Sequence, residues 1–232
     1  REGCRDEGRG GGVVGKCLCL MIGTPQRGAQ GRSSAASGVY KRQRQRPWAH
    51  TLGRGMRVVL MGNAGAGKTT LARRLMDGYR VPRLSLDEIA FSEGAERRPL
   101  AESIRDVLEF IASNESWIIE GCYADIIERA LKHGGTLVFL NPGVATCIEH
   151  CRRRPWEPEK FATESEQAQN LENLLLWVSE YETREDEYGL KQHRRLFDSF
   201  SGRKFEFTSV VPNAAQQIIE ANPTPPSGCM RA

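Results

Sequence analysis

The chain has 232 residues, of which 39% are hydrophobic and 27% are charged, and its formal net charge is +4. This composition is typical of a globular protein and not of a disordered or fibrous one. The apolar runs reach only about half a dozen residues, which excludes a membrane-spanning helix of ~20 residues.

The positive charge is concentrated at the start of the chain. Residues 1–55 carry 11 Lys/Arg and 3 Asp/Glu, whereas the other 177 residues carry 22 Lys/Arg and 26 Asp/Glu. The first segment has no helical or strand periodicity, so we expect 1–55 to be a disordered or non-native basic leader that precedes a natural start at Met56. The acidic body lacks the basic face that binds nucleic acid or an anionic membrane, and neither partner is expected.

Short apolar runs then alternate with stretches of helical periodicity. We expect strands at 57–61, 84–86, 117–120, 136–140 and 204–208. We expect helices at 69–77, 100–113, 125–132, 144–153, 165–184 and in a last stretch that ends near residue 200. This alternation predicts an α/β domain over 56–210, with a parallel sheet of about five strands covered on both faces, followed by a C-terminal tail over 211–232.

The first strand and first helix enclose the sequence GNAGAGKT, which matches the P-loop (Walker A) pattern G-x-x-x-x-G-K-[ST]. Gly62, Gly65 and Gly67 allow backbone angles and close approaches that a Cβ would prevent. Successive N–H groups at the start of the helix can then bind phosphate oxygens. Lys68 can reach the β- and γ-phosphates, and the Thr69 hydroxyl can bind Mg²⁺.

This motif predicts the three-layer α/β/α P-loop NTPase fold and a site for ATP and Mg²⁺. The residues expected to bind the nucleotide are Gly62, Asn63, Ala64, Gly65, Ala66, Gly67, Lys68, Thr69 and Thr70.

Over about residues 56–208, the chain resembles P-loop kinases of the adenylate kinase and shikimate kinase-like group. It also resembles bacterial kinase-like proteins labelled as DNA topology modulators. An N-K-x-D guanine-binding motif is missing, and the body is small for a two-part AAA+ motor. The resemblance implies a short lid and transfer of the γ-phosphoryl group of Mg-ATP.

Two acids at predicted strand ends are candidates for the chemistry. Asp87 resembles the acid with which shikimate kinases contact their acceptor, although Ser85 stands where that family has another acid. Asp87 could orient or deprotonate an acceptor hydroxyl, or it could only cap the following helix. Glu120 resembles the acid of the nucleotide-kinase strand that ends in Asp-Gly, and it would then lie near Mg²⁺. The alternative is a structural Glu, and the arginine that follows in that family is absent.

Arginines of two later segments complete the resemblance. Arg153 and Arg154 stand where the group has its lid, whose arginines close over the transferring phosphoryl group. Cations favoured by a helix C-terminus are the alternative. Arg184 and Arg195 resemble the paired arginines after the lid and would share a stripe if one helix continued through Gly189. Exposed surface arginines are the alternative there.

Two other groups of residues have a less specific pattern. Cys147, His150 and Cys151 share one predicted helix but lack the loop spacing and the fourth partner of a zinc site, so zinc is not expected. Trp177 and Tyr181 are better explained as core residues than as a platform for a base. The seven cysteines show no framework spacing, which favours reduced thiols and a cytoplasmic location.

The sequence thus predicts a cytoplasmic kinase, monomer or homodimer, whose partners are ATP and a small phosphate acceptor. Lys68, Asp87, Arg153 and Arg154 are the expected catalytic residues. Asp87, Arg184 and Arg195 are expected to contact the acceptor, and Thr69 and Glu120 to hold Mg²⁺. The acceptor is a hydroxyl metabolite or a nucleotide. The alternatives are a P-loop ATPase or nucleotide-dependent regulatory protein without a small acceptor, and a nucleic-acid-associated protein, which the acidic body disfavours.

Overall fold

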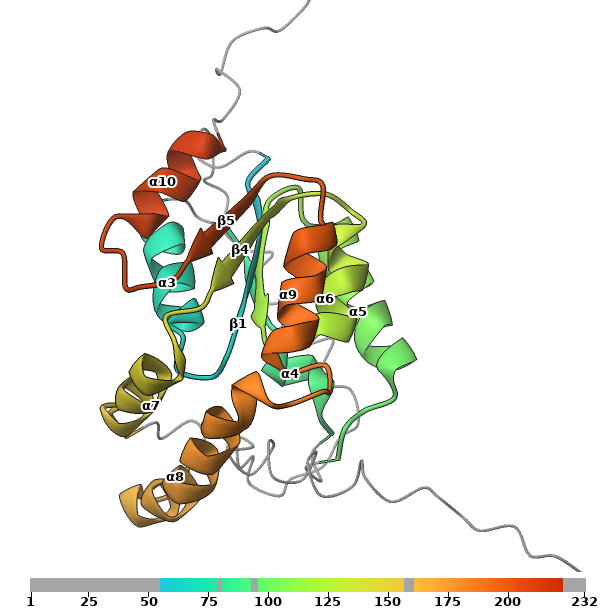
Figure 1. Ribbon diagram of the computed structural model, residues 1–232. Coiled ribbons are helices and arrows are strands. Elements are labelled where there is room, and N and C mark those ends of the chain that lie inside the picture. The colour runs from blue at the N-terminus through green and yellow to red at the C-terminus, as the bar shows by residue number, and fades with distance from the viewer. Residues whose placement is uncertain (1–54, 79–80, 93–95, 157–160, 223–232) are drawn as a thin grey trace, which may run out of the picture.

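The computed structural model describes residues 55–78, 81–92, 96–156 and 161–222 (Figure 1). Residues 1–54 of the predicted leader and the residues from 223 onward lie outside the described residues. Within the described ranges, no helix combines the length and the apolar character that crossing a bilayer requires.

Five parallel strands form one sheet in the order β2-β3-β1-β4-β5. The three central strands are rich in Val, Ile, Leu and Phe, which suit a pleated surface that is buried on both faces. In β1, the side chains from Val58 to Met61 have an exposed fraction of 0%. The strands are β1 (Arg57–Gly62), β2 (Arg83–Ser85), β3 (Trp117–Gly121), β4 (Thr136–Leu140) and β5 (Lys204–Phe207).

Helices cover both faces of this sheet (Figure 1). One face carries α3 (Lys68–Gly78) and α10 (Ala214–Ala221). The other carries α5 (Leu100–Ser113), α6 (Ala124–Leu131) and α9 (Leu190–Ser199). The predicted three-layer α/β/α P-loop NTPase fold is therefore confirmed.

The remaining helices lie at the carboxyl ends of the strands (Figure 1). The short α4 (Asp87–Ala90) follows β2. The helix α7 (Val144–Arg152) follows β4 and packs against α8 (Glu164–Ser179). The loop between α7 and α8 is the segment expected to form the lid, and residues 157–160 of this loop lie outside the described residues.

The helix α10 was not predicted, because its sequence belongs to the segment 211–232 that was expected to be a tail. Apolar residues recur there at one-turn spacing, as Ala214 and Ile218. Both side chains are buried, and α10 packs against α3. The packed part of the chain therefore continues past residue 210.

The helix predicted at 165–184 ends earlier than expected, at Ser179, and is followed by the 3-10 turn η1 (Glu180–Glu182). Carbonyl groups near a helix C-terminus have no partner within the helix. Here Arg184 donates to the carbonyl of Trp177 at 2.9 Å, and Asn63 of the P-loop donates to that of Val178 at 3.1 Å. The end of α8 is therefore attached both to the segment that follows it and to the P-loop.

Candidate functional site

The P-loop connects the central strand of the sheet to the N-terminus of α3. Gly62 and Gly65 have φ angles of 152° and 79°, which residues with a Cβ rarely adopt. A Cβ on Gly62 would lie 2.2 Å from the carbonyl oxygen of Leu140, and one on Gly65 would lie 2.3 Å from that of Cys147. The loop is thus pressed against β4 and α7, and these two positions require glycine.

Side chains around the P-loop hold its carbonyl groups. The ammonium group of Lys68 donates to the carbonyls of Gly62 and Asn63, at 3.0 and 2.8 Å. From α7, His150 Nδ1 donates to the carbonyl of Gly65 at 2.8 Å. Cys147 and Cys151, its neighbours on α7, are buried. This helix therefore supports the phosphate-binding loop, and His150 uses its ring in a contact with the P-loop backbone.

Thr69 and Glu120, the two predicted metal ligands, lie next to each other although 51 positions separate them. The Thr69 hydroxyl donates to Glu120 Oε2 at 2.9 Å, and Arg83 donates to Glu120 Oε1 at 2.7 Å. The Glu120 residue is 3% exposed at the end of β3. A hydroxyl and a carboxylate beside a P-loop are the oxygen ligands that suit Mg²⁺. The pairing of Arg83 with Glu120 was not predicted, because it depends on the neighbouring positions of β2 and β3.

Asp87 lies at the start of α4, just beyond the carboxyl end of β2. It accepts a hydrogen bond of 2.7 Å from the Tyr123 hydroxyl. The N-cap of α4 is Leu86, so Asp87 does not have the alternative role of a helix cap. Burial, reinforced by the charge of Asp87, raises the pKa of Tyr123 well above its usual value. The phenol therefore remains a neutral donor to the carboxylate.

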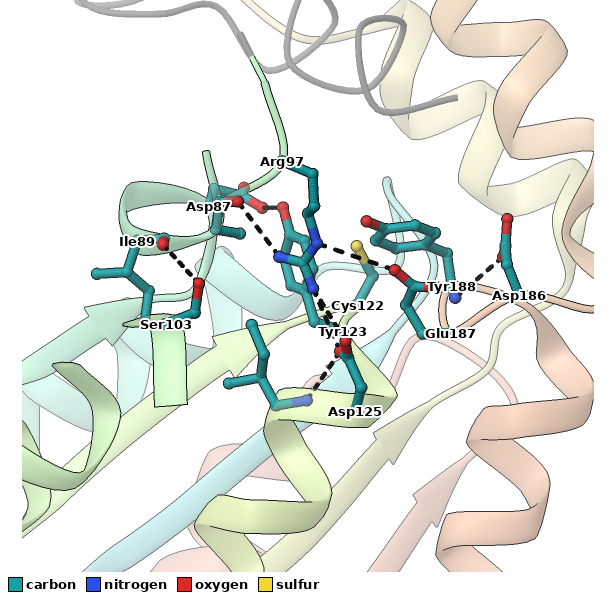
Figure 2. Close-up of polar contacts among 12 residues, drawn as sticks. Asp87, Ile89, Arg97, Ser103, Cys122, Tyr123, Asp125, Asp186, Glu187 and Tyr188 are labelled. Atoms are coloured by element: carbon teal, nitrogen blue, oxygen red, sulfur yellow. Dashed lines mark hydrogen bonds and ion pairs between the residues drawn. The ribbon is translucent and has the colours of Figure 1, made fainter. Parts of the chain in front are cut away.

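Arg97 was missed by the sequence reasoning, yet it lies at the centre of the charged groups around Asp87 (Figure 2). Its guanidinium donates to Asp125 Oδ2 at 3.1 Å, and Glu187 Oε1 lies 3.9 Å from its Nε. The guanidinium carbon lies 4.9 Å from the centre of the Tyr123 ring. Arg97 is positioned by an isolated β-bridge to Phe91, and no sequence pattern indicates this bridge. We call Asp87, Arg97, Tyr123, Asp125 and Glu187 the Arg97 cluster.

The thiol of Cys122 is buried directly after the end of β3. Burial raises the pKa of Cys122 to about 12, while Lys68 lowers this pKa, Asp87 raises it and Arg97 lowers it. All three charges therefore act on one thiol. Figure 2 shows the sulfur atom beside Arg97 and Tyr123.

The two predicted lid arginines differ in their surroundings. The Arg153 side chain is 74% exposed and pairs with Glu149 at 2.6 Å on α7. Arg154 is half-buried and lines a cavity between α7 and α8, together with Phe161 and Leu171. Neither residue has a described contact with the P-loop. Their catalytic role therefore stays a prediction.

Arg184 and Arg195 are not brought together on one stripe. Between them α8 ends at Ser179 and η1 at Glu182, and the separate helix α9 begins at Leu190 after the buried Gly189. The Arg184 side chain is 7% exposed and stacks on Trp177, with 4.3 Å between the guanidinium carbon and the ring centre. Arg195 is exposed on α9 and lies 3.7 Å from a carboxylate of α6. Contact of either arginine with the acceptor stays a prediction.

Trp177 and Tyr181 belong to the interior, as expected. Both residues are buried, at 5% and 3% exposure. The Tyr181 hydroxyl donates to His193 Nδ1 at 2.7 Å, and His193 Nε2 donates to the carbonyl of Cys122 at 2.9 Å. Burial lowers the pKa of His193 to about 4, so its imidazole is neutral near pH 7. This chain of hydrogen bonds supports the end of β3 from beneath.

Comparisons with known proteins agree with this geometry. Residues 58–168 match the family described as an AAA domain. The adenylate kinase of Methylorubrum extorquens (strain PA1) is 31% identical over 97 residues, which are 42% of this chain and 47% of that protein. The chain thus spans about half the length of the curated relatives it matches.

Solved structures of kinases also align with the chain. A shikimate kinase from Acinetobacter baumannii in complex with shikimate aligns over 74% of this chain and 93% of that one, with 19% identity and a TM-score of 0.42. A gluconokinase from Sinorhizobium meliloti 1021 aligns over 72% and 89%, with 14% identity and a TM-score of 0.41. The P-loop and the similarity to adenylate kinases together make the chain similar to P-loop kinases.

Proposed function

We propose that this chain is a kinase that transfers the γ-phosphoryl group of Mg-ATP to a small acceptor. The observation that carries the proposal is the contact of Thr69 with Glu120 next to Lys68 of the P-loop, at the carboxyl edge of the sheet where Asp87 follows β2. A phosphoryl donor held at Lys68 and an acceptor held at Asp87 would then meet at the carboxyl edge of the sheet. Phosphoryl transfer depends mainly on such positioning and on electrostatic stabilisation.

The nucleotide end has groups that fit a triphosphate. Backbone N–H groups of the P-loop at the N-terminus of α3 would bind phosphate oxygens, and Lys68 would exchange its contacts with the P-loop carbonyls for the β- and γ-phosphates. Thr69 and Glu120 would hold Mg²⁺, whose positive charge would stabilise the negative charge on the phosphate oxygens. Arg83 orients the Glu120 carboxylate and would keep it aimed at that position.

At the acceptor end, Asp87 would accept the proton of an acceptor hydroxyl. Tyr123 donates to one of its oxygens and so fixes the orientation of the carboxylate. General-base help of this kind contributes roughly 10²–10⁴-fold to a rate. We also propose that Arg153 and Arg154 close over the transferring group. The exposed pair of Arg153 with Glu149 would be easily given up, because exposed ion pairs contribute little stability.

Release of ADP from Mg-ATP by the full chain, with and without acceptors, tests the proposal. We expect at least one small hydroxyl compound to raise ADP release about tenfold or more, and Lys68→Ala to abolish this release. A Lys132→Ala variant changes an exposed lysine at the end of α6 and should behave like the wild type.

Two results would contradict the kinase proposal. Turnover that Lys68→Ala leaves intact would show that the P-loop is not the site of chemistry. ADP release that depends on Lys68 but ignores every acceptor would instead support the alternative, a P-loop ATPase or nucleotide-dependent regulatory protein. Circular dichroism of Lys68→Ala would show whether the variant is folded.

A further inference from the structure

The charge of Arg97 is already compensated by protein groups. The guanidinium donates to both carboxylate oxygens of Asp125, at 3.4 and 3.1 Å, and lies 3.9 Å from a carboxylate oxygen of Glu187. A third donor group, Nη1, is bound to the carbonyl of Ala90 at 3.3 Å. An arginine that binds a phosphate or carboxylate ligand uses two free N–H donors of its guanidinium side by side. In Arg97 these donors are already bound to protein groups on several sides.

The stacking of aromatic rings also restricts Arg97. Its guanidinium carbon lies 4.9 Å from the centre of the Tyr123 ring, 5.8 Å from that of Phe91 and 6.0 Å from that of Tyr188. All three rings are buried. A cation between aromatic rings and carboxylates is held in place, so turning it toward a ligand would cost these contacts together.

The other described charges of the Arg97 cluster are negative. Asp125 and Glu187 pair with the guanidinium, and a third carboxylate, that of Asp87, is bound by Tyr123, whose ring faces the same guanidinium (Figure 2). Burial raises the pKa of Asp125, and the charge of Glu187 raises it further, while Arg97 lowers it. Negative charge in this region is therefore already costly before a ligand enters.

We propose that the acceptor is an uncharged or cationic hydroxyl compound, and that the Arg97 cluster discriminates against anionic acceptors such as nucleoside monophosphates and sugar acids. This proposal rests on the proposed kinase function and names the substrate class of that site. A phosphate or carboxylate on the acceptor would meet Asp87, Asp125 and Glu187 while the guanidinium is occupied. A neutral hydroxyl meets no such repulsion, and an ammonium group gains from the excess of carboxylates.

The reaction balances with groups that the proposal names. The acceptor oxygen forms a bond to the γ-phosphorus of ATP, and the bond between that phosphorus and the oxygen bridging to the β-phosphate breaks. ADP leaves with the electron pair of the broken bond. The proton of the acceptor hydroxyl passes to the Asp87 carboxylate, whose other partner is the neutral phenol of Tyr123.

Acceptors that differ mainly in charge test the proposal directly. One set shares a six-carbon skeleton: glucitol is neutral, glucosamine is cationic and gluconate is anionic. A second set compares adenosine, cytidine and guanosine with their 5′-monophosphates. We expect kcat/KM for ADP formation by the full chain to be at least tenfold higher for the neutral or cationic members than for the anionic ones.

A substitution in the Arg97 cluster provides the second measurement. Glu187→Gln removes one negative charge, so we expect KM for gluconate and AMP to fall at least threefold while KM for the neutral compounds stays within twofold. Glu185→Gln is the matched control, because Glu185 is exposed and pairs with Lys191 outside the Arg97 cluster. If the role of Glu187 were purely structural, Glu187→Gln would raise KM for all acceptors alike and would not lower KM for the anionic ones. Thermal unfolding of both variants checks that they remain folded.

The outcomes separate this inference from the proposed function. Preference for AMP or gluconate in the wild type, with turnover still lost in Lys68→Ala, overturns the acceptor class and leaves the kinase standing. An unchanged preference in Glu187→Gln overturns the role of the Arg97 cluster. No response to any acceptor, with Mg-ATP bound in a titration, contradicts both.

Discussion

The P-loop and the Arg97 cluster both follow carboxyl ends of strands in the sheet but are built in different ways. The P-loop is eight consecutive residues whose binding groups belong mainly to the backbone. The Arg97 cluster consists of side chains from four separate segments, brought together by the ends of β2 and β3 and by the loop before α9. A backbone cradle binds phosphate whatever the rest of the ligand is, whereas side chains from several segments can vary independently. Under the proposed function, the first region would bind the donor and the second would select the acceptor.

A substitution at Gly65 tests the backbone side of this comparison and has the largest expected effect. In Gly65→Ala, the Cβ would lie 2.3 Å from the carbonyl oxygen of Cys147, so the P-loop must shift away from α7. Loss of one well-placed donor costs about 10²–10³-fold in rate, and a shifted loop loses several, so we expect kcat/KM to fall about 10³-fold or more.

The control for Gly65 lies two residues further along the same loop. Gly67 also has a positive φ, of 94°, but a Cβ there meets nothing within 4 Å. Gly67→Ala therefore has the backbone strain without the clash, and its rate loss should be clearly smaller. Equal losses in the two variants would contradict the idea that contact with α7 shapes the loop.

Asp87→Asn tests the side-chain region and is expected to have an intermediate effect. The amide keeps the size and the contact with Tyr123 but accepts no proton, so kcat should fall about 10²-fold while Mg-ATP affinity stays unchanged. Steady-state kinetics with varied ATP and varied acceptor separate the two quantities. Asp77→Asn, at the exposed end of α3, is the control. A Mg-ATP affinity that falls in Asp87→Asn would place this residue at the nucleotide end instead.

Lowering the pH tests the buried His193, which contacts the end of β3, and the expected effect is on the free energy of unfolding. The pKa of His193 is lowered by burial to about 4, below the ordinary value of 6.5. Between these values the unfolded chain binds a proton that the folded chain does not, so the contribution is present above pH 6.5 and is lost as the pH falls toward 4. The loss is on the order of 3 kcal/mol in the free energy of unfolding.

Urea unfolding at several pH values measures this loss. His193→Gln should be less stable at pH 7, because the contact with Tyr181 is disturbed, and its stability should depend less on pH between 4 and 6.5. The same pH slope in the variant and the wild type would show that other groups cause the acid sensitivity.

The P-loop and the strands were predictable because their signals are local. GNAGAGKT is contiguous, and the apolar runs of the central strands coincide closely with the observed β3 and β4. The proximity of Thr69 and Glu120 was also predicted, because the P-loop motif places Thr69 at Mg²⁺ and the nucleotide-kinase resemblance places Glu120 near the same ion. Arg97 and Arg83 have no such signal, since their partners lie on other segments and only the folded chain brings them together.

Local pattern also failed where tertiary contacts decided the outcome. The helix α8 ends at Ser179, where Arg184 and Asn63 bind its last carbonyl groups, so Arg184 and Arg195 do not share one helix. The helix α10 forms against α3, and its eight residues would be marginal alone in water.

The sequence alone determined the parallel α/β architecture and the phosphate-binding loop, because hydrophobic periodicity and glycine conformation are encoded in neighbouring residues. Only the tertiary structure decided which charges surround Asp87 and that Arg97 is already occupied by Asp125 and Glu187. The physical reason is range: backbone conformation is set over a few residues, whereas the electrostatics of a site is the sum over every charge that folding brings near it.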